Sequence, residues 1–155
     1  MIRSQLLIAT AIVVSSAITA CSESNTTAPK GVPADPPPAR SGSLRVTTDC
    51  SNYTGLAGSS CTIATSNLGA IAVGSTVLYA SAAGAAALHS DVTLTAPGSG
   101  TDSAFGHCDI DLVTNAGTCT FSGGTGNLAG FQADASVAHP GGSIWYWEAT
   151  YTFAQ

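Results

Sequence analysis

The chain has 155 residues, and only 8% of them are charged although 45% are hydrophobic. Its four Lys and Arg residues are outnumbered by nine Asp and Glu residues, which gives a formal net charge of −5 at pH 7. Such a chain has no basic stripe that could neutralise a phosphate backbone, so nucleic acid is excluded as a partner.

Residues 1–20 have the organisation of a signal peptide. Arg3 and the amino terminus form a short positive region, and residues 6–18 form an apolar run that only Thr and Ser interrupt. A helix needs about 20 apolar residues to cross a bilayer, so this run is too short for a transmembrane helix and has the length of a signal peptide core. We therefore expect the chain to be exported and residues 1–20 to be removed.

The apolar run ends in Ile18-Thr19-Ala20-Cys21. This segment resembles the lipobox of bacterial lipoproteins, and the resemblance implies cleavage before Cys21 and acylation of its thiol. More than one acyl chain would anchor the protein stably to a membrane. The alternative is ordinary secretion, which is less favoured because Ile18 is bulkier than a secretory cleavage site prefers. Within the lipoprotein family, Ser22 after the cysteine points to the outer membrane of the bacterial cell envelope.

Residues 21–43 are predicted to form a tether between the lipid and a folded domain. The segment is polar and rich in proline, and it has neither helical nor strand periodicity. Proline fixes φ and lacks an amide hydrogen, so we expect an extended, semi-rigid segment without a strand. Residues 44–155 remain as one domain that is large enough for a single hydrophobic core.

The domain has an even number of cysteines, which in an exported chain predicts two disulfides. The same spacing separates the members of the first pair and of the second, so we predict two local disulfides, each worth about 3 kcal/mol of loop entropy. The predicted pairs are Cys50 with Cys61 and Cys108 with Cys119.

One difficulty leaves crossed disulfide pairings open. A tight turn at residues 115–117 would place Leu112, rather than Cys108, opposite Cys119. A bulge or a different turn would be needed for the local pairing. Zinc binding is the rival interpretation, but the cysteines lack the C-x-x-C spacing and an oxidising compartment disfavours thiolates, so we predict no metal site.

Apolar and polar residues alternate with period two through the domain, which indicates half-buried strands. In residues 143–153 the odd positions are mainly aromatic and the even positions are mainly polar, so we expect the odd face to form the core or a cavity wall. The side chains predicted to line the interior or a cavity are Trp145, Trp147, Tyr151, Phe153, Phe121 and Phe131.

Turn residues separate these alternating segments, and the resulting pattern of short strands is typical of an all-β fold. We expect an antiparallel β-barrel of about eight strands that is stapled by two disulfides. The predicted strands are residues 44–49, 61–66, 76–81, 86–96, 104–114, 118–122, 131–138 and 143–154.

The segment CTFSGGTGNLAGF (residues 119–131) resembles the GGTG-x-hydrophobic-x-G segment of the allene oxide cyclase and dirigent barrels. The segment WEATYTF (residues 147–153) is similar to their closing strand. Residues 106–126, with their GHC…TCTFSGGTG arrangement, are also similar to a group of exported bacterial proteins. The resemblance implies an eight-stranded barrel whose apolar interior holds a small hydrophobic molecule. No catalytic residue carries over, because the matched segment holds structural glycines and core residues.

Other polar motifs in the domain give no clear site. Residues 123–126 are glycine-rich, but they lack the Lys and the following helix of a phosphate-binding loop, so they are expected to form a turn. The histidines His89, His107 and His139 lack metal-ligand spacing.

The carboxylates of the domain are stronger candidates for a functional site. Asp109 and Asp111 share one strand face, where they could bind a cation, although a solvated face is the more common outcome. Glu148 lies between two tryptophans and points away from them. It would enter the cavity and act as an acid only if the closing strand were reversed.

Two function classes follow. The first is an envelope-anchored binding or interaction module that holds a small apolar ligand without a cofactor. The alternative is a cyclase or isomerase acting in the barrel cavity. An enzyme needs a fixed acid, base or water in its cavity. The strand faces place few polar groups inside, which favours the binding module.

Overall fold

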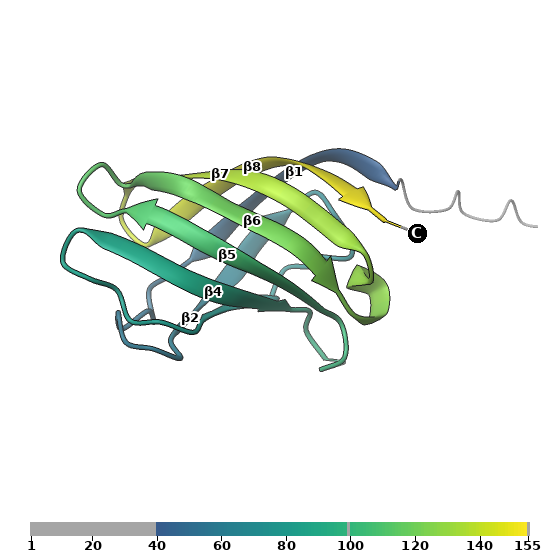
Figure 1. Ribbon diagram of the computed structural model, residues 1–155, viewed down its shortest axis with the longest axis horizontal. Helices are drawn as coiled ribbons and strands as arrows, with labels where there is room; N and C mark the ends of the chain where they lie inside the picture. The colour runs from purple at the N-terminus through teal and green to yellow at the C-terminus, as the bar shows by residue number, and fades with distance from the viewer. Residues whose placement is uncertain (1–39, 99, 155) are drawn as a thin grey trace, which may run out of the picture. The chain divides into compact units, whose positions relative to one another are not determined.

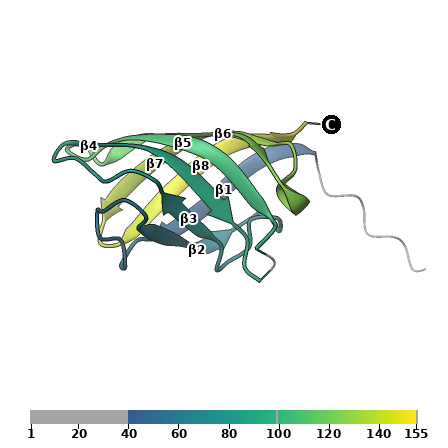
Figure 2. The ribbon, with the colours of Figure 1, turned by 60° about the horizontal axis from the view of Figure 1, so that its bottom comes forward.

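The computed structural model describes residues 40–98 and 100–154, which form a closed antiparallel barrel of eight strands in sequence order (Figures 1 and 2). The predicted all-β barrel is confirmed. The elements are β1 (Ser41–Asp49), β2 (Ser60–Ser66), β3 (Thr76–Tyr79), β4 (Ala87–Thr95), β5 (Ser103–Asp111), β6 (Ala116–Gly124), the 3-10 helix η1 (Gly126–Leu128), β7 (Phe131–Gly141) and β8 (Ile144–Phe153).

The barrel begins earlier than the sequence predicted, because β1 starts at Ser41 and not at residue 44. Residues 1–39 lie outside the described part of the chain. The predicted signal peptide, Cys21 and the tether up to residue 39 therefore lie outside it as well. Within the described ranges, no helix is long and apolar enough to cross a bilayer.

Side chains fill the barrel interior. Inward and outward positions alternate along every long strand, as β7 shows with buried apolar residues between exposed polar ones. An eight-stranded barrel is just wide enough for its side chains to fill. The largest fully buried apolar side chains are Phe131, Ile63, Ile71, Leu128 and Val77.

Both predicted disulfides are present. Cys108 and Cys119 stand directly opposite each other on β5 and β6, with Cα atoms 4.1 Å apart. Cys50 and Cys61 continue the register of β1 with β2, with Cα atoms 4.4 Å apart. A bulge at Ala64 sets this register, because one extra residue on β2 shifts the pairing.

The prediction of a tight turn at residues 115–117 is wrong. Asp111 pairs with Ala116, so residues 112–115 form the turn and the cysteines come into register. The Asp111 carboxylate accepts hydrogen bonds from the backbone N–H groups of Val113 (2.8 Å) and Thr114 (2.9 Å). Asn115 takes the left-handed conformation with φ of 57°, which Asn tolerates better than most residues.

The closing strand β8 has the predicted orientation. Trp147 is only 2% exposed and packs in the core, whereas Glu148 points to solvent. Glu148 Oε1 lies 3.6 Å from Nε of Arg45, which is its cross-strand neighbour on β1. Both of these side chains are largely exposed, so their ion pair contributes little to stability.

We predict that Trp147→Ala lowers the free energy of unfolding by about 3–5 kcal/mol, because it removes a large buried aromatic side chain. Trp147→Phe should cost less, since Nε1 of Trp147 is buried without a hydrogen-bond partner among the described residues. Glu148→Gln should change the free energy of unfolding by no more than about 0.5 kcal/mol. Denaturant titrations of the three variants test this, and a larger loss for Glu148→Gln than for Trp147→Ala would contradict the assigned orientation of β8.

Candidate binding site at the barrel mouth

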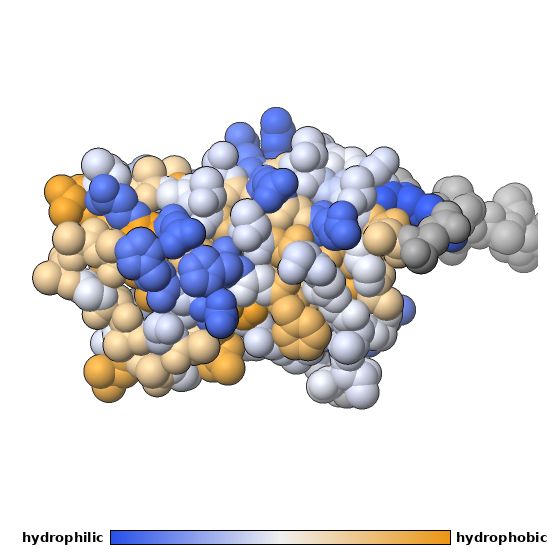
Figure 3. All heavy atoms as spheres, viewed as in Figure 1, coloured by the Kyte–Doolittle hydropathy of each residue, from blue (hydrophilic) through white to orange (hydrophobic). Residues whose placement is uncertain are grey.

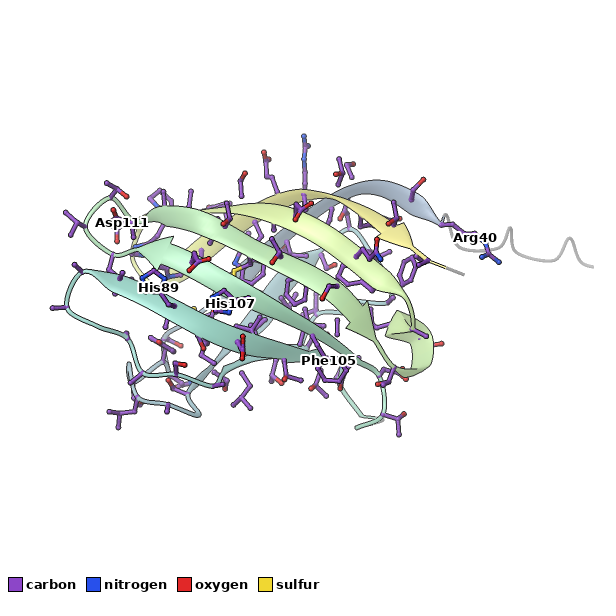
Figure 4. All side chains as sticks on the ribbon, in the orientation of Figure 1. Arg40, His89, Phe105, His107 and Asp111 are labelled. Carbon is purple, nitrogen blue, oxygen red and sulfur yellow. A yellow bond between two sulfur atoms is a disulfide. The ribbon has the colours of Figure 1, made fainter. Side chains whose placement is uncertain are left out.

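The antiparallel topology gathers the chain segments at two opposite ends of the barrel. One end, which we call the mouth, holds Arg40, the segments 67–75, 96–102 and 125–130, and the end of β8. The other, which we call the distal end, holds the segments 50–59, 80–86, 112–115 and 142–143. Figure 4 shows Arg40 at the mouth and Asp111 toward the distal end.

A pocket of about 690 Å³ opens at the mouth. Its volume lies within the range of roughly 300–1,000 Å³ that is usual for small-molecule sites. Most of its lining side chains are short and apolar, and a few polar ones stand among them. The lining residues are Arg40, Leu68, Gly69, Ala70, Ala72, Ala96, Pro97, Asp102, Asn127, Ala129, Phe153 and Ala154.

Small residues on three loops create the space in this pocket. Ala70, Ala96 and Ala129 come from different connections, and an alanine leaves room where a larger side chain would fill the opening. Phe153 supplies the aromatic wall. Its ring lies 5.5 Å from that of Phe131, so it joins the pocket to the aromatic core of the barrel.

The glycine-rich segment shapes one side of the mouth. Asp102 accepts hydrogen bonds from Asn127 through its backbone N–H (3.2 Å) and its side-chain amide (2.8 Å). Gly126 has a φ of 58°, and a side chain there would collide with the Asp102 carboxylate. The turn predicted at residues 123–126 is only partly confirmed, because residues 123 and 124 still belong to β6 and the chain turns from Thr125 into η1. Gly126 is required there by both conformation and space.

The predicted lining residues fall into three groups. Phe153 lines the mouth pocket. Trp145 lies toward the distal end, where its ring stacks on His139 at 4.6 Å. The remaining four, Trp147, Tyr151, Phe121 and Phe131, are buried in the packed interior, and Phe121 and Tyr151 also border a second hollow of about 410 Å³ on β6, β7 and β8.

These core aromatics nevertheless form one continuous chain that leads to the mouth. Ring centroids lie 6.1 Å apart between Trp147 and Phe121 and 5.9 Å apart between Phe121 and Phe131. From Phe131 the chain continues to Phe153 at the pocket wall. Periodicity identified the aromatic face of β8, but the alanines and Asp102 of the pocket carry no signal in the sequence, because they meet only when separate loops converge.

A second polar arrangement lies on the outer wall of β4 and β5. Both strands contain the pattern His-x-Asp and run antiparallel, so each His stands opposite an Asp. His89 Nδ1 lies 2.6 Å from Asp109 Oδ1, and His107 Nδ1 lies 2.7 Å from Asp91 Oδ1. Figure 4 labels the two histidines on β4 and β5. His107 Nε2 lies 3.5 Å from Asp109 Oδ1, which joins the two pairs into one cluster.

The sequence placed these side chains on an exposed face but did not reveal that they pair. The pairing depends on the register between β4 and β5, which a single strand does not specify. Asp111 points away from this cluster and caps its own turn. In the part of the chain that the structure describes, no group of three or more His, Cys, Asp or Glu is placed to hold a metal ion.

The cluster shifts the pKa values of His107 and Asp109. The hydrogen bond that His107 donates to Asp91 raises the pKa of His107 above its ordinary value of 6.5, with a smaller contribution from the charge of Asp109. The hydrogen bond from His89 lowers the pKa of Asp109 below its ordinary value of 3.8. A raised His pKa adds stability that is fully present below pH 6.5 and is lost as the pH rises through the pKa of folded His107. A lowered Asp pKa adds stability above pH 3.8 that is lost as the pH falls through the pKa of folded Asp109.

We predict that His107 titrates above 6.5 in the folded protein, and that Asp91→Asn lowers its pKa toward that value by removing the carboxylate that accepts its hydrogen bond. NMR titration of the imidazole carbon protons measures both. Asp109→Asn is the matched control and should lower the pKa of His107 by less. A His107 pKa at or below 6.5 in the unmodified protein would contradict the pairing with Asp91.

Comparison with known proteins adds no relative, because the chain matches no protein-family model, no curated protein and no solved structure. The resemblance of residues 119–131 to the allene oxide cyclase and dirigent barrels therefore stays a prediction from the sequence. What the site can do has to be argued from its own geometry and chemistry.

Proposed function

We propose that this protein is an envelope-anchored binding module that holds a small apolar ligand at the mouth of its barrel. The observation that carries the proposal is the pocket of about 690 Å³, whose lining is mainly Ala, Pro, Leu and Phe. Binding sites for small molecules are typically apolar hollows with a few polar groups that set the ligand's orientation.

The polar groups of the pocket lie beside its apolar wall. Asp102 and Asn127 are hydrogen-bonded to each other on one side, which keeps them fixed as the ligand binds. A ligand with an apolar body and one hydrogen-bonding group would contact Phe153 and the alanines while it reached this pair. The aromatic chain behind Phe153 gives that wall a rigid support.

The barrel interior gives little support to the cyclase alternative. Among the described residues every Asp, Glu and His is at least partly exposed, so none is enclosed in the core as an acid or base. The carboxylate that lines the mouth pocket, Asp102, already accepts two hydrogen bonds from Asn127. The buried polar side chains are Thr48, Ser75 and Ser90, and the last two donate to backbone carbonyls. We therefore prefer binding to catalysis.

Anchoring through Cys21 is the second part of the proposal. The lipobox-like segment supports it, and the two disulfides fit an oxidising compartment outside the cytoplasm. The chain enters the barrel at Arg40, which also lines the pocket. A tether from Cys21 would thus join the domain at its mouth.

We predict that the protein binds the neutral apolar fluorophore N-phenyl-1-naphthylamine, and that Ala129→Trp weakens this binding about tenfold by filling the pocket. Fluorescence titration gives the dissociation constant. Ala138→Trp is the control, because Ala138 is exposed on the outer wall of β7 and should leave the affinity unchanged. Equal affinities for the unmodified protein and Ala129→Trp would reject the mouth as the binding site.

We predict that Cys21→Ser abolishes incorporation of a labelled fatty acid in a bacterial host, because only a thiol can form the thioether to the lipid. The control variant Ser22→Ala retains the thiol of Cys21 and should be labelled as strongly as the unmodified chain. Equal labelling of Cys21→Ser would reject the lipoprotein assignment and leave the pocket proposal unaffected.

A further inference from the structure

The distal end of the barrel exposes large apolar side chains that the mouth pocket does not use. Leu56 is 67% exposed and Val113 is 74% exposed, although apolar side chains of this size are usually buried. Between them lies the connection from β3 to β4, residues 80–86, in which five of the seven residues are alanine. We call this surface the distal cap, formed by Leu56, Ala57, Ala82, Ala85, Ala86 and Val113.

Backbone hydrogen bonds join the three segments of the distal cap. The Ala83 N–H donates to the Gly55 carbonyl at 2.8 Å, which joins segments 50–59 and 80–86. The Leu112 N–H donates to the Ala86 carbonyl at 2.8 Å, which joins segments 80–86 and 112–115. Figure 3 shows apolar surface over the end of the barrel where these segments lie. Continuous exposed apolar surface of this kind marks interaction sites.

Carboxylates border the distal cap. Asp111 lies beside Val113, whose backbone N–H it binds, and Asp109 precedes it on the outer face of β5. Asp49 ends β1 at the same end of the barrel. The described residues contain two Lys or Arg residues: Arg40 lies at the mouth and Arg45 pairs with Glu148 on another face. The border of the distal cap is therefore acidic, with His89 and His107 as its nearby basic groups.

This charge distribution indicates which kind of partner can bind the distal cap. A second copy placed on the distal cap would bring the same carboxylates together, and like charges in an interface are unfavourable. An anionic lipid surface would meet the same repulsion. A partner with Lys or Arg around an apolar patch would bury Leu56 and Val113 and neutralise Asp111 at the same time.

We propose that the distal cap is the docking surface for a partner protein whose apolar contact residues are flanked by Lys or Arg. This goes beyond ligand binding at the mouth, because it uses the opposite end of the barrel. In a chain tethered at the mouth, the distal cap is the end remote from the point of attachment.

The probe for this test is a synthetic amphipathic peptide of Leu and Lys, compared by fluorescence anisotropy with the same peptide carrying Glu in place of Lys. The Lys peptide should bind the purified protein at least about tenfold more tightly than the Glu peptide. The double variant Leu56→Ser, Val113→Ser should weaken binding of the Lys peptide about tenfold, because it removes the apolar contact. Val73→Ser is the matched control: Val73 is also exposed, at 61%, but it lies at the mouth, so affinity should not change.

The variant Asp111→Asn tests how much the negative charge of Asp111 contributes to peptide binding. Asn lacks that charge but keeps an oxygen that can accept the hydrogen bonds of the turn. It should weaken binding of the Lys peptide and reduce the dependence of that binding on salt. Equal binding of the two peptides, or an equal loss in Val73→Ser, would overturn the proposal. Dimers that sedimentation velocity detects, and that the double Ser variant abolishes, would assign the surface to a second copy instead. Neither result bears on N-phenyl-1-naphthylamine binding at the mouth.

Discussion

The pairing of β1 with β8 is the constraint on which the rest of the structure depends. It joins nine residue pairs, from Ser41 with Thr152 to Asp49 with Ile144, and it closes the sheet into a barrel. Closure removes the two exposed edges of an open sheet and encloses one face of every strand. It also brings Arg40 and Phe153 to the same end, where the Phe153 N–H donates to the Arg40 carbonyl at 2.7 Å. Arg40 and Phe153 therefore line the mouth pocket together with the small residues of the three loops.

Closure also divides the molecule into two ends with different chemistry. The mouth combines short apolar side chains with a hydrogen-bonded Asp102–Asn127 pair, and it forms a pocket. The distal end exposes Leu56 and Val113 beside acidic residues. A pocket suits a small molecule and an exposed apolar surface suits a larger partner. The two proposals therefore concern separate surfaces and can be tested separately.

The outer wall is built from cross-strand pairs that are each weak. Arg45 with Glu148 and the His-Asp cluster on β4 and β5 lie in solvent, where ion pairs add little to stability. Stability comes instead from the packed interior and from the disulfides at Cys50–Cys61 and Cys108–Cys119. This division leaves the surface residues open to change without loss of the fold, which is why surface substitutions can separate binding from stability in the proposed tests.

The sequence by itself determined that the domain has eight strands and which face of each strand points inward. Several strand ends differ from the predicted ones, such as the start of β1 at Ser41 and the end of β5 at Asp111. Trp147 and Glu148 were assigned to opposite faces correctly, because the period of two is a local property of extended backbone. It also indicated the cysteine pairs through their spacing. Only the tertiary structure decided the turn at residues 112–115, the pairing of His89 with Asp109, the mouth pocket and the distal cap. Each of these depends on register or on loops that are distant in the chain, and the pattern of one segment holds no information about the segment that it will meet.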